Sequence, residues 1–98
     1  MAKYLVLWQV DETRIPVNPQ ERTAILEGSV AMVEQDAKKG ISKDWGQFVG
    51  EGRGYGIAEG TEVEVTAMLQ QYAPYVQFEV HPVMSARMVR QAIKAMPR

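Results

Sequence analysis

His81 is the only histidine in the chain, and it offers the clearest option for acid–base chemistry. The segment from Tyr75 to His81 alternates polar and apolar side chains, which is typical of a strand with two different faces. Glu79 lies two residues before His81 and therefore on the same face, where its carboxylate could orient the imidazole or raise its pKa. The pair predicts a general base, and the alternative is a surface or interface histidine at a strand end.

Arg53 and Tyr55 could supply the donor that such a base needs opposite it. Both lie at alternate positions of a strand predicted over 53–58, so they share one face. In this hypothesis an acidic C–H next to a carbonyl loses its proton to His81, while Tyr55 or Arg53 donates to the enolate oxygen. Arg53 could instead form a solvated ion pair with Glu51, and such exposed pairs contribute little.

Several large rings could wall a pocket for a ring-shaped or apolar ligand, with core packing as the alternative. They are Trp8, Trp45, Tyr55, Tyr72 and Tyr75. The run GEGRGYG matches neither the dinucleotide fingerprint, since Ile57 occupies the third glycine position, nor a P-loop, since it lacks Gly-Lys-Ser/Thr. One histidine with scattered carboxylates has no metal-ligand spacing. We therefore expect no nucleotide, metal or other cofactor.

Glycine is concentrated in one stretch, WGQFVGEGRGYGIAEG, which covers residues 45–60 and holds six of the eight glycines. A strand over 53–58 would show Arg53, Tyr55 and Ile57 on one face and only small residues on the other. Glycine in a strand marks a bend, a bulge or a close approach to the backbone. The bare face is therefore expected either to pack tightly against a helix or to line a cavity.

The elements that must position these residues follow from capping and periodicity. Asn18-Pro19 begins a helix, Thr61 and Glu64 form a capping box, Pro74 stops the second helix, and Pro82 ends the last strand or places it at an edge. The first half is expected to form a strand over 3–10, a helix over about 19–39 and a hairpin over 44–49 and 53–58. A second helix should begin at 61, with Val65, Met68, Leu69 and Tyr72 as its apolar stripe. A strand over 75–81 and a basic helix over 85–96, which Ser85 caps, should follow.

This order, βαββαβ with a C-terminal helix, predicts one ferredoxin-like α+β domain over 1–98, with its core over 3–82. Its four-stranded antiparallel sheet would carry helices on one face only. In the hairpin we expect Val49 to pair with Arg53, which places Trp45 opposite Ile57 and Phe48 opposite Gly54. A loop of Gly50, Glu51 and Gly52 would join the two strands.

The open face of the sheet is expected to be mixed in character, and such a face usually marks an interface or a groove. It would carry Tyr75, Gln77, Glu79 and His81 on the last strand, Leu5, Leu7 and Gln9 on the first, and Gly54 and Gly56 on the third. We expect two copies to pack sheet against sheet, leaving a pocket between sheet and helices or within the joined sheets.

Charge is uneven along the chain. The net charge is −1, but residues 85–98 hold four basic side chains and no acid, so the remaining residues carry −5. An acidic body argues against nucleic acid as a partner. No apolar run approaches the ~20 residues of a membrane span, and the N-terminus lacks a signal-peptide cleavage site, so we expect a cytoplasmic protein.

Two sets of residues resemble known families. The run PYVQFEV after a helix ending QQY resembles the muconolactone isomerase-like branch of the dimeric α/β-barrel superfamily, in element order over roughly residues 3–82 as well. The set DWGQF, GEGRGYG and QQYAPYVQFEVHPV is similar to a family of short bacterial proteins known only as a domain of unknown function. The first resemblance implies two protomers that join their sheets, with ligand pockets between sheet and helices.

Two functional hypotheses follow. In the first, the protein is a homodimer or higher homo-oligomer that binds a small organic acid or lactone, with isomerisation or monooxygenase-like oxidation that needs no cofactor. His81 would be the base and Glu79 its orienting partner, and Tyr55, Arg53, Trp8, Trp45 and Tyr75 would bind the ligand. In the second, the protein is not an enzyme, and the sheet face and the basic tail serve oligomerisation or regulation.

Overall fold

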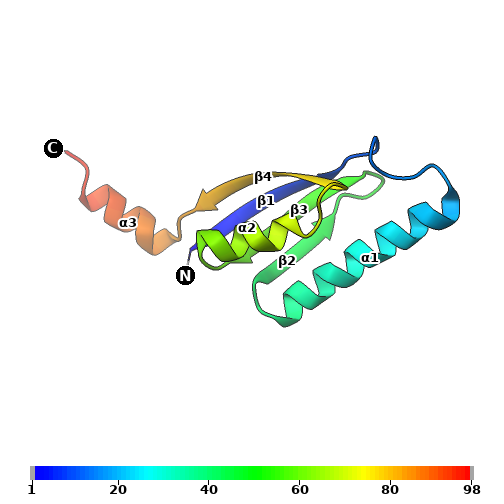
Figure 1. Cartoon of the computed structure of the whole chain (residues 1–98). Helices are drawn as coiled ribbons and strands as arrows, with labels where there is room; N and C mark the ends of the chain where they lie inside the picture. Colours follow the sequence, from blue (N-terminus) through cyan, green and yellow to red (C-terminus); the bar gives the residue numbers. More distant parts are fainter. Residues whose placement is uncertain (1, 98) are drawn as a thin grey trace.

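The computed structural model describes residues 2–97, and its elements alternate as the sequence predicts (Figure 1). The elements are β1 (Lys3–Val10), α1 (Pro19–Lys38), β2 (Ser42–Gln47), β3 (Arg53–Glu59), α2 (Glu62–Gln70), β4 (Val76–Val83) and α3 (Ala86–Lys94). The strands form one antiparallel sheet in the order β2-β3-β1-β4. The predicted α+β, ferredoxin-like fold is confirmed.

Local capping explains where the helices begin. The side chain of Asn18 accepts hydrogen bonds from the backbone N–H groups of Gln20 and Glu21, and Pro19 occupies the first helical position. Thr61 and Glu64 form the predicted capping box at the start of α2. The hydroxyl of Ser85 accepts from the backbone N–H of Met88 at the start of α3. Gly40, at φ 83°, follows the end of α1 in the left-handed conformation.

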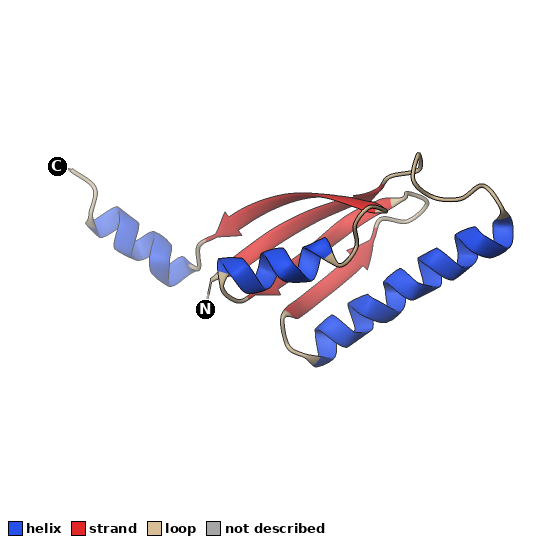
Figure 2. Cartoon of the chain, viewed as in Figure 1, coloured by secondary structure: helices blue, strands red, loops and turns tan. Residues whose placement is uncertain are grey.

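The core lies where α2 packs on the middle of the sheet. Val6 and Ala58 from the two central strands meet Val65 and Met68 from α2, and all four are buried. β1 is central in the sheet, which agrees with its run of apolar residues at both parities. Figure 2 shows α1 as a long helix in front of the sheet edge that β2 forms, and α1 packs mainly against that strand.

The predicted register of the hairpin is wrong by one residue. Trp45 pairs with Gly56 and Gln47 pairs with Gly54, because β2 ends at Gln47 and the connection runs from Phe48 to Gly52. Glu51 donates its backbone N–H to the carbonyl of Phe48 in this longer loop. A slip of one residue reverses the faces of a strand, but the faces of β3 are reversed as well. Trp45 therefore still faces the helices, as the predicted pairing implied, but opposite Gly56 instead of Ile57.

The glycines of β3 also lie on the face opposite to the one predicted. Gly54 pairs with Trp8 and Gly56 with Val6, and paired residues of an antiparallel sheet share a face. Both glycines therefore face the helices, together with buried Val6. The open face carries Arg53, Tyr55 and Ile57 on this strand. The set predicted for β1 is correct, and Gln77, Glu79 and His81 of β4 lie on the open face as predicted, with Leu5 opposite His81 and Leu7 opposite Glu79. Tyr75 does not, because β4 begins at Val76 and Tyr75 lines the cavity on the helix-covered side.

β4 continues beyond its predicted end, and α3 leaves the body of the molecule. Pro82 pairs with Tyr4 inside β4, which the strand tolerates because it lies at the sheet edge. Only Met84 and Ser85 separate β4 from α3, and α3 extends away from the sheet (Figure 1). All of its residues are exposed. Within residues 2–97, no helix is long and apolar enough to cross a membrane.

Candidate ligand-binding pocket

A cavity of about 410 Å³ lies between the helix-facing side of the sheet and the two helices that cover it. This size is within the range of small-molecule sites. Its lining is mostly apolar and aromatic and comes from all four strands and from α1, α2 and the segments that join them. The sheet and the adjoining segments contribute Val6, Trp8, Val10, Trp45, Gln47, Gly56, Tyr72, Tyr75 and Phe78, and α1 contributes Arg22, Leu26, Ser29, Val30, Val33 and Asp36.

Two stacked indoles form one wall of this pocket. The rings of Trp8 and Trp45 are parallel within 1°, with centroids 5.3 Å apart. Trp8 also donates from Nε1 to the backbone carbonyl of Tyr55 at 3.2 Å. The absent side chain of Gly54 makes room for this arrangement, because a Cβ built there would lie 2.6 Å from Cζ2 of Trp8. The bare face of β3 therefore lines a cavity, one of the two outcomes expected from the sequence.

A second aromatic group closes the pocket beside α2. Tyr72 and Phe78 pack edge to face, with centroids 6.0 Å apart and an interplanar angle of 71°. Tyr75 lines the same cavity. Aromatic rings from β1, β2 and the α2–β4 region therefore contribute to the lining of one cavity.

Asp36 is the one buried charged residue among those that the structure describes. It is 3% exposed, and its Oδ2 accepts a hydrogen bond of 2.7 Å from the hydroxyl of Tyr72. Burial, together with this hydrogen bond, raises the pKa of Tyr72 well above its usual range. No hydrogen bond to Oδ1 is found within residues 2–97, and none of the fully buried polar side-chain atoms there lacks a partner. Oδ1 therefore keeps some accessible surface, and Asp36 is one of the residues that line the cavity.

Asp36 is not among the residues predicted from the sequence, although the pattern of α1 contains a signal for it. The cavity-facing residues of α1 follow one another at helical spacing from Arg22 through Leu26, Val30 and Val33 to Asp36. An acid at the end of an otherwise apolar stripe is expensive to bury without a partner. That partner, Tyr72, lies 36 positions away in the chain, so the pair could not be recognised from local spacing.

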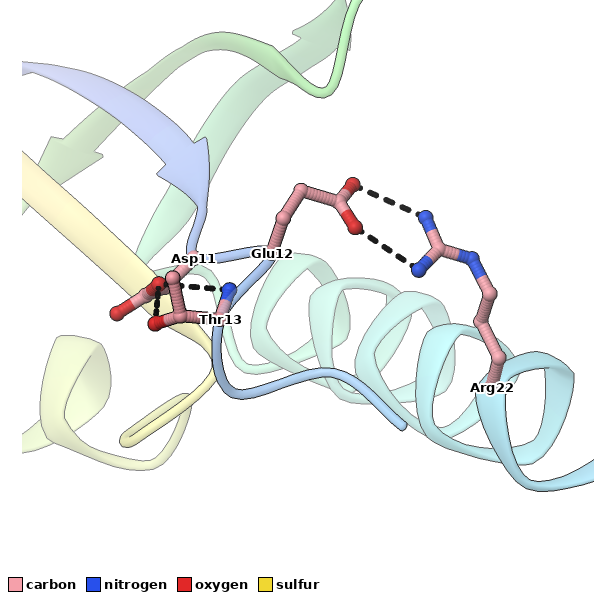
Figure 3. Close-up of polar contacts among 4 residues, drawn as sticks. All are labelled: Asp11, Glu12, Thr13 and Arg22. Atoms are coloured by element: carbon pink, nitrogen blue, oxygen red, sulfur yellow. Dashed lines mark hydrogen bonds and ion pairs between the residues drawn. The ribbon is translucent and has the colours of Figure 1, made fainter. Parts of the chain in front are cut away.

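An ion pair marks another part of the cavity lining, where the β1–α1 connection meets α1 (Figure 3). The guanidinium of Arg22 donates to both carboxylate oxygens of Glu12, at 2.8 and 2.9 Å. These hydrogen bonds hold the pKa of the Glu12 carboxyl below its usual value. The neighbouring Asp11 accepts from the backbone and hydroxyl of Thr13. Arg22 is the only basic side chain among the lining residues described.

The residues predicted as a site lie on two opposite faces of the sheet. Trp8, Trp45 and Tyr75 line the cavity. His81 and Glu79 are paired on the open face, with His81 Nε2 2.9 Å from Glu79 Oε2, and both are exposed.

Arg53 and Tyr55 lie on the open face as well. Arg53 forms an ion pair with Glu51 at 3.0 Å, the alternative that the sequence left open. The hydroxyl of Tyr55 donates to Asp44 at 2.9 Å, and this carboxylate raises the pKa of Tyr55. The histidine and the aromatic pocket therefore do not meet within one protomer.

Fold and cavity together define a ferredoxin-like α+β protein with an aromatic pocket between its sheet and its helices. The chain belongs to the family described as Domain of unknown function (DUF3303), whose model matches residues 2–97. No curated protein matches the chain.

Proposed function

We propose that this protein binds a small, planar organic molecule in the cavity between sheet and helices. The observation that carries the proposal is the combination of a cavity of about 410 Å³, two stacked indoles in its wall and one buried carboxylate. Apolar cavities with a few well-placed polar groups are typical of small-molecule sites. The indole faces favour a ligand with a ring or another flat apolar body.

Two charged groups line the cavity, and either could orient a ligand at its own end. Oδ1 of Asp36 is available to accept a hydrogen bond from a ligand hydroxyl or N–H group, while Oδ2 is held by Tyr72. Arg22 would offer a fork-shaped donor to a ligand carboxylate that displaces Glu12. The two groups are 14 residues apart on α1, or about 21 Å at 1.5 Å per residue, so a small ligand would meet one of them. A small organic acid fits the end of the cavity beside Arg22, and a lactone with a hydroxyl or N–H group fits the end beside Asp36.

If the ligand carries an acidic C–H next to a carbonyl, Asp36 would accept that proton on its carboxylate and return it to another carbon of the same molecule. This isomerisation needs no cofactor, because the proton that Asp36 removes is the one that it returns. The resemblance of PYVQFEV to the muconolactone isomerase-like branch supports this class of reaction. Asp36 replaces His81 as the base within the pocket, since His81 lies on the other face of the sheet.

The intrinsic fluorescence of the protein gives a direct test, because both tryptophans of the chain line the cavity. We expect a member of a panel of aromatic acids and lactones to quench or shift this emission in a saturable way. Replacing Asp36 by Asn keeps the shape of the side chain but removes its charge. This variant should weaken binding of a donor-bearing ligand about tenfold, or ~1.4 kcal/mol.

Asp44→Asn is the matched control, since Asp44 lies on the open face and is bonded to Tyr55. It should bind as the unmodified protein does. Saturable quenching that Asp36→Asn and Asp44→Asn reduce equally would contradict the proposed role of Asp36. A panel with no saturable binder would count against the pocket as a site for this ligand class.

We also propose that a second copy covers the open face of the sheet. No helix of residues 2–97 lies on that face, and it carries the apolar or aromatic side chains Leu5, Leu7, Tyr55 and Ile57. In such a homodimer the His81–Glu79 pair would lie in or beside the seam. A catalytic role for His81 would then require a cavity that both protomers build.

A further inference from the structure

α3 is an amphipathic helix that nothing covers in the single chain. Its apolar side chains, Met88, Val89, Ala92 and Ile93, recur at intervals of three and four residues and so form one continuous side, and Met96 follows just beyond its end. Ile93 is 60% exposed. The opposite side carries Arg87, Arg90 and Lys94. A helix of nine residues is too short to be stable in water by itself, so its apolar side needs a surface to pack on.

That surface is not within easy reach on the same chain. The two residues 84–85 join α3 to β4, and α3 continues outward from the end of that strand (Figure 1). The described chain is accordingly elongated, with extents of 61 × 25 × 22 Å. α3 spans only about 14 Å at 1.5 Å per residue. A helix that projects in this way is placed to reach a neighbouring molecule.

The helix-covered side of the body offers a groove with matching character. Leu26 and Val30 of α1 line the cavity, yet they are 36% and 47% exposed, so the cavity is open along α1. This mouth is apolar and is bounded by acidic helices. The apolar mouth matches the apolar side of α3, and the acidic helices are opposite in charge to its basic residues.

Charge decides between the two faces of the body. α1 holds four acids and two basic residues, and α2 holds two acids and no basic residue, so these helices together carry −4. The open face of the sheet carries the basic residues Lys3 and Arg53 and the acidic residues Asp44, Glu59 and Glu79, so its net charge is −1. α3 carries +3 from Arg87, Arg90 and Lys94. Complementary charge therefore favours the helix-covered side.

We infer that α3 of one copy docks in the open mouth of the cavity of a second copy, with Met88, Val89 and Ile93 against Leu26 and Val30. Arg87, Arg90 and Lys94 then face away from the groove, so their charge favours approach to the acidic helices of the second copy without contacts inside the groove. In a two-fold dimer this contact forms twice, because α3 of each protomer docks on the other protomer. We call α3 in this role the arm. The arm closes the cavity on its open side. This inference concerns assembly and stands whether or not a small ligand binds inside.

A disulfide trap tests this contact in the full chain, which has no cysteine of its own. Two separately tagged proteins, Val30→Cys and Ile93→Cys, are mixed and oxidised. We expect the mixed disulfide between the two chains to exceed either homodimer. The control pair is Val17→Cys with Ile93→Cys, because Val17 is 94% exposed but does not line the cavity. It should give several-fold less mixed product.

A second measurement shows whether the mixed disulfide forms through specific docking or through random collisions between chains. Val89→Glu should abolish the Val30–Ile93 mixed disulfide, whereas Val17→Glu, the same change at an exposed site, should leave it intact; circular dichroism checks that both variants fold. Equal yields in the two Cys pairs would overturn the inference. So would an intrachain disulfide in a monomer that carries both Val30→Cys and Ile93→Cys. Recruitment of a monomeric full chain to anionic phosphatidylserine vesicles through α3 would overturn it in favour of a membrane surface.

Discussion

Asp36 and Tyr72 form the hydrogen bond that most directly links α1 to the region behind α2. Both residues are buried, and the contact is 2.7 Å long. A carboxylate in this position is tolerated because the Tyr72 hydroxyl donates to it and because its second oxygen is not fully buried. One residue pair would thus contribute both to stability and to the proposed ligand site.

Tyr72→Phe should lower the free energy of unfolding at pH 7 by about 1–3 kcal/mol, because it leaves a buried carboxylate without its donor. Tyr75→Phe is the matched control, since no hydrogen bond of the Tyr75 hydroxyl is found within residues 2–97. Urea denaturation followed by circular dichroism measures both. Equal stabilities of the two variants would show that the contact contributes nothing.

The raised pKa of Tyr72 also predicts a pH dependence. Above pH ~10 an unfolded tyrosine loses its proton while folded Tyr72 keeps it. The unfolded state then binds fewer protons than the native state, so stability is full below pH ~10 and falls as pH rises beyond it. Tyr72→Phe should show a shallower alkaline decline in melting temperature than Tyr75→Phe. Parallel declines would refute this linkage.

Gly54 illustrates how a single missing side chain shapes the pocket. A Cβ at this position would lie 2.6 and 2.8 Å from two ring atoms of Trp8, and it would also collide with the backbone carbonyl of Gly46. Gly54→Ala should therefore destabilise the protein by about 1–3 kcal/mol and displace the Trp8–Trp45 stack. Thermal melts and near-ultraviolet circular dichroism of the tryptophans measure the two effects.

The matched control is Gly28→Ala, which is the same substitution in the middle of α1. A Cβ there has no atom within 4 Å, and alanine is favoured over glycine in a helix by about 0.5–1 kcal/mol. We expect Gly28→Ala to raise the melting temperature. A Gly54→Ala protein as stable as Gly28→Ala, with an unchanged tryptophan spectrum, would disprove the steric argument.

Among the elements, the helices follow their local signals closely. Asn18, Thr61 and Ser85 each cap the helix that the sequence places after them. The hairpin does not follow its local signal, because several registers are compatible with a glycine-rich turn. The chosen register is the one that places Trp45 on Trp8 and removes a large apolar ring from the open face.

Thr61→Ala should destabilise α2 and, with it, the core, since Val65 and Met68 pack from this helix. Loss of an N-cap hydroxyl typically costs about 1 kcal/mol. Thr66→Ala is the control, because Thr66 is exposed within the same helix and alanine is the better helix former. In chemical denaturation, the midpoint of Thr61→Ala should lie below that of the unmodified protein, and the midpoint of Thr66→Ala should lie above it. Two equal midpoints would mean that the capping box is not limiting.

At the scale of the whole molecule, two surfaces are left without cover in the single chain. One is the open face of the sheet, and the other is the apolar side of α3. They lie on different parts of the protomer, so a sheet contact and an arm contact could coexist in an assembly larger than a dimer. Each contact can be removed by a variant that leaves the other intact.

Leu7→Glu should reduce the oligomeric mass, because Leu7 lies in the middle of the open face, between Tyr55 and Glu79 on the neighbouring strands. A carboxylate there would be buried unpaired in the seam, opposite the Glu79 charge. Light scattering after size exclusion at micromolar concentration measures the mass. Val17→Glu should keep the unmodified mass. A monomeric unmodified protein, or an unchanged mass in Leu7→Glu, would reject the sheet contact.

The sequence alone determined the order of elements, the helix starts, the uncovered set on β1 and, apart from Tyr75, the uncovered set on β4. It gave the edge position of β4 as one of two alternatives. These features depend on contacts within a few residues or on strict alternation along one strand. Tertiary structure decided the hairpin register, the face that Gly54 and Gly56 take, and the pairing of Asp36 with Tyr72. It also separated His81 from the aromatic pocket. The physical reason is that these choices depend on which distant side chains compete for the same buried volume, and spacing along the chain does not encode that competition.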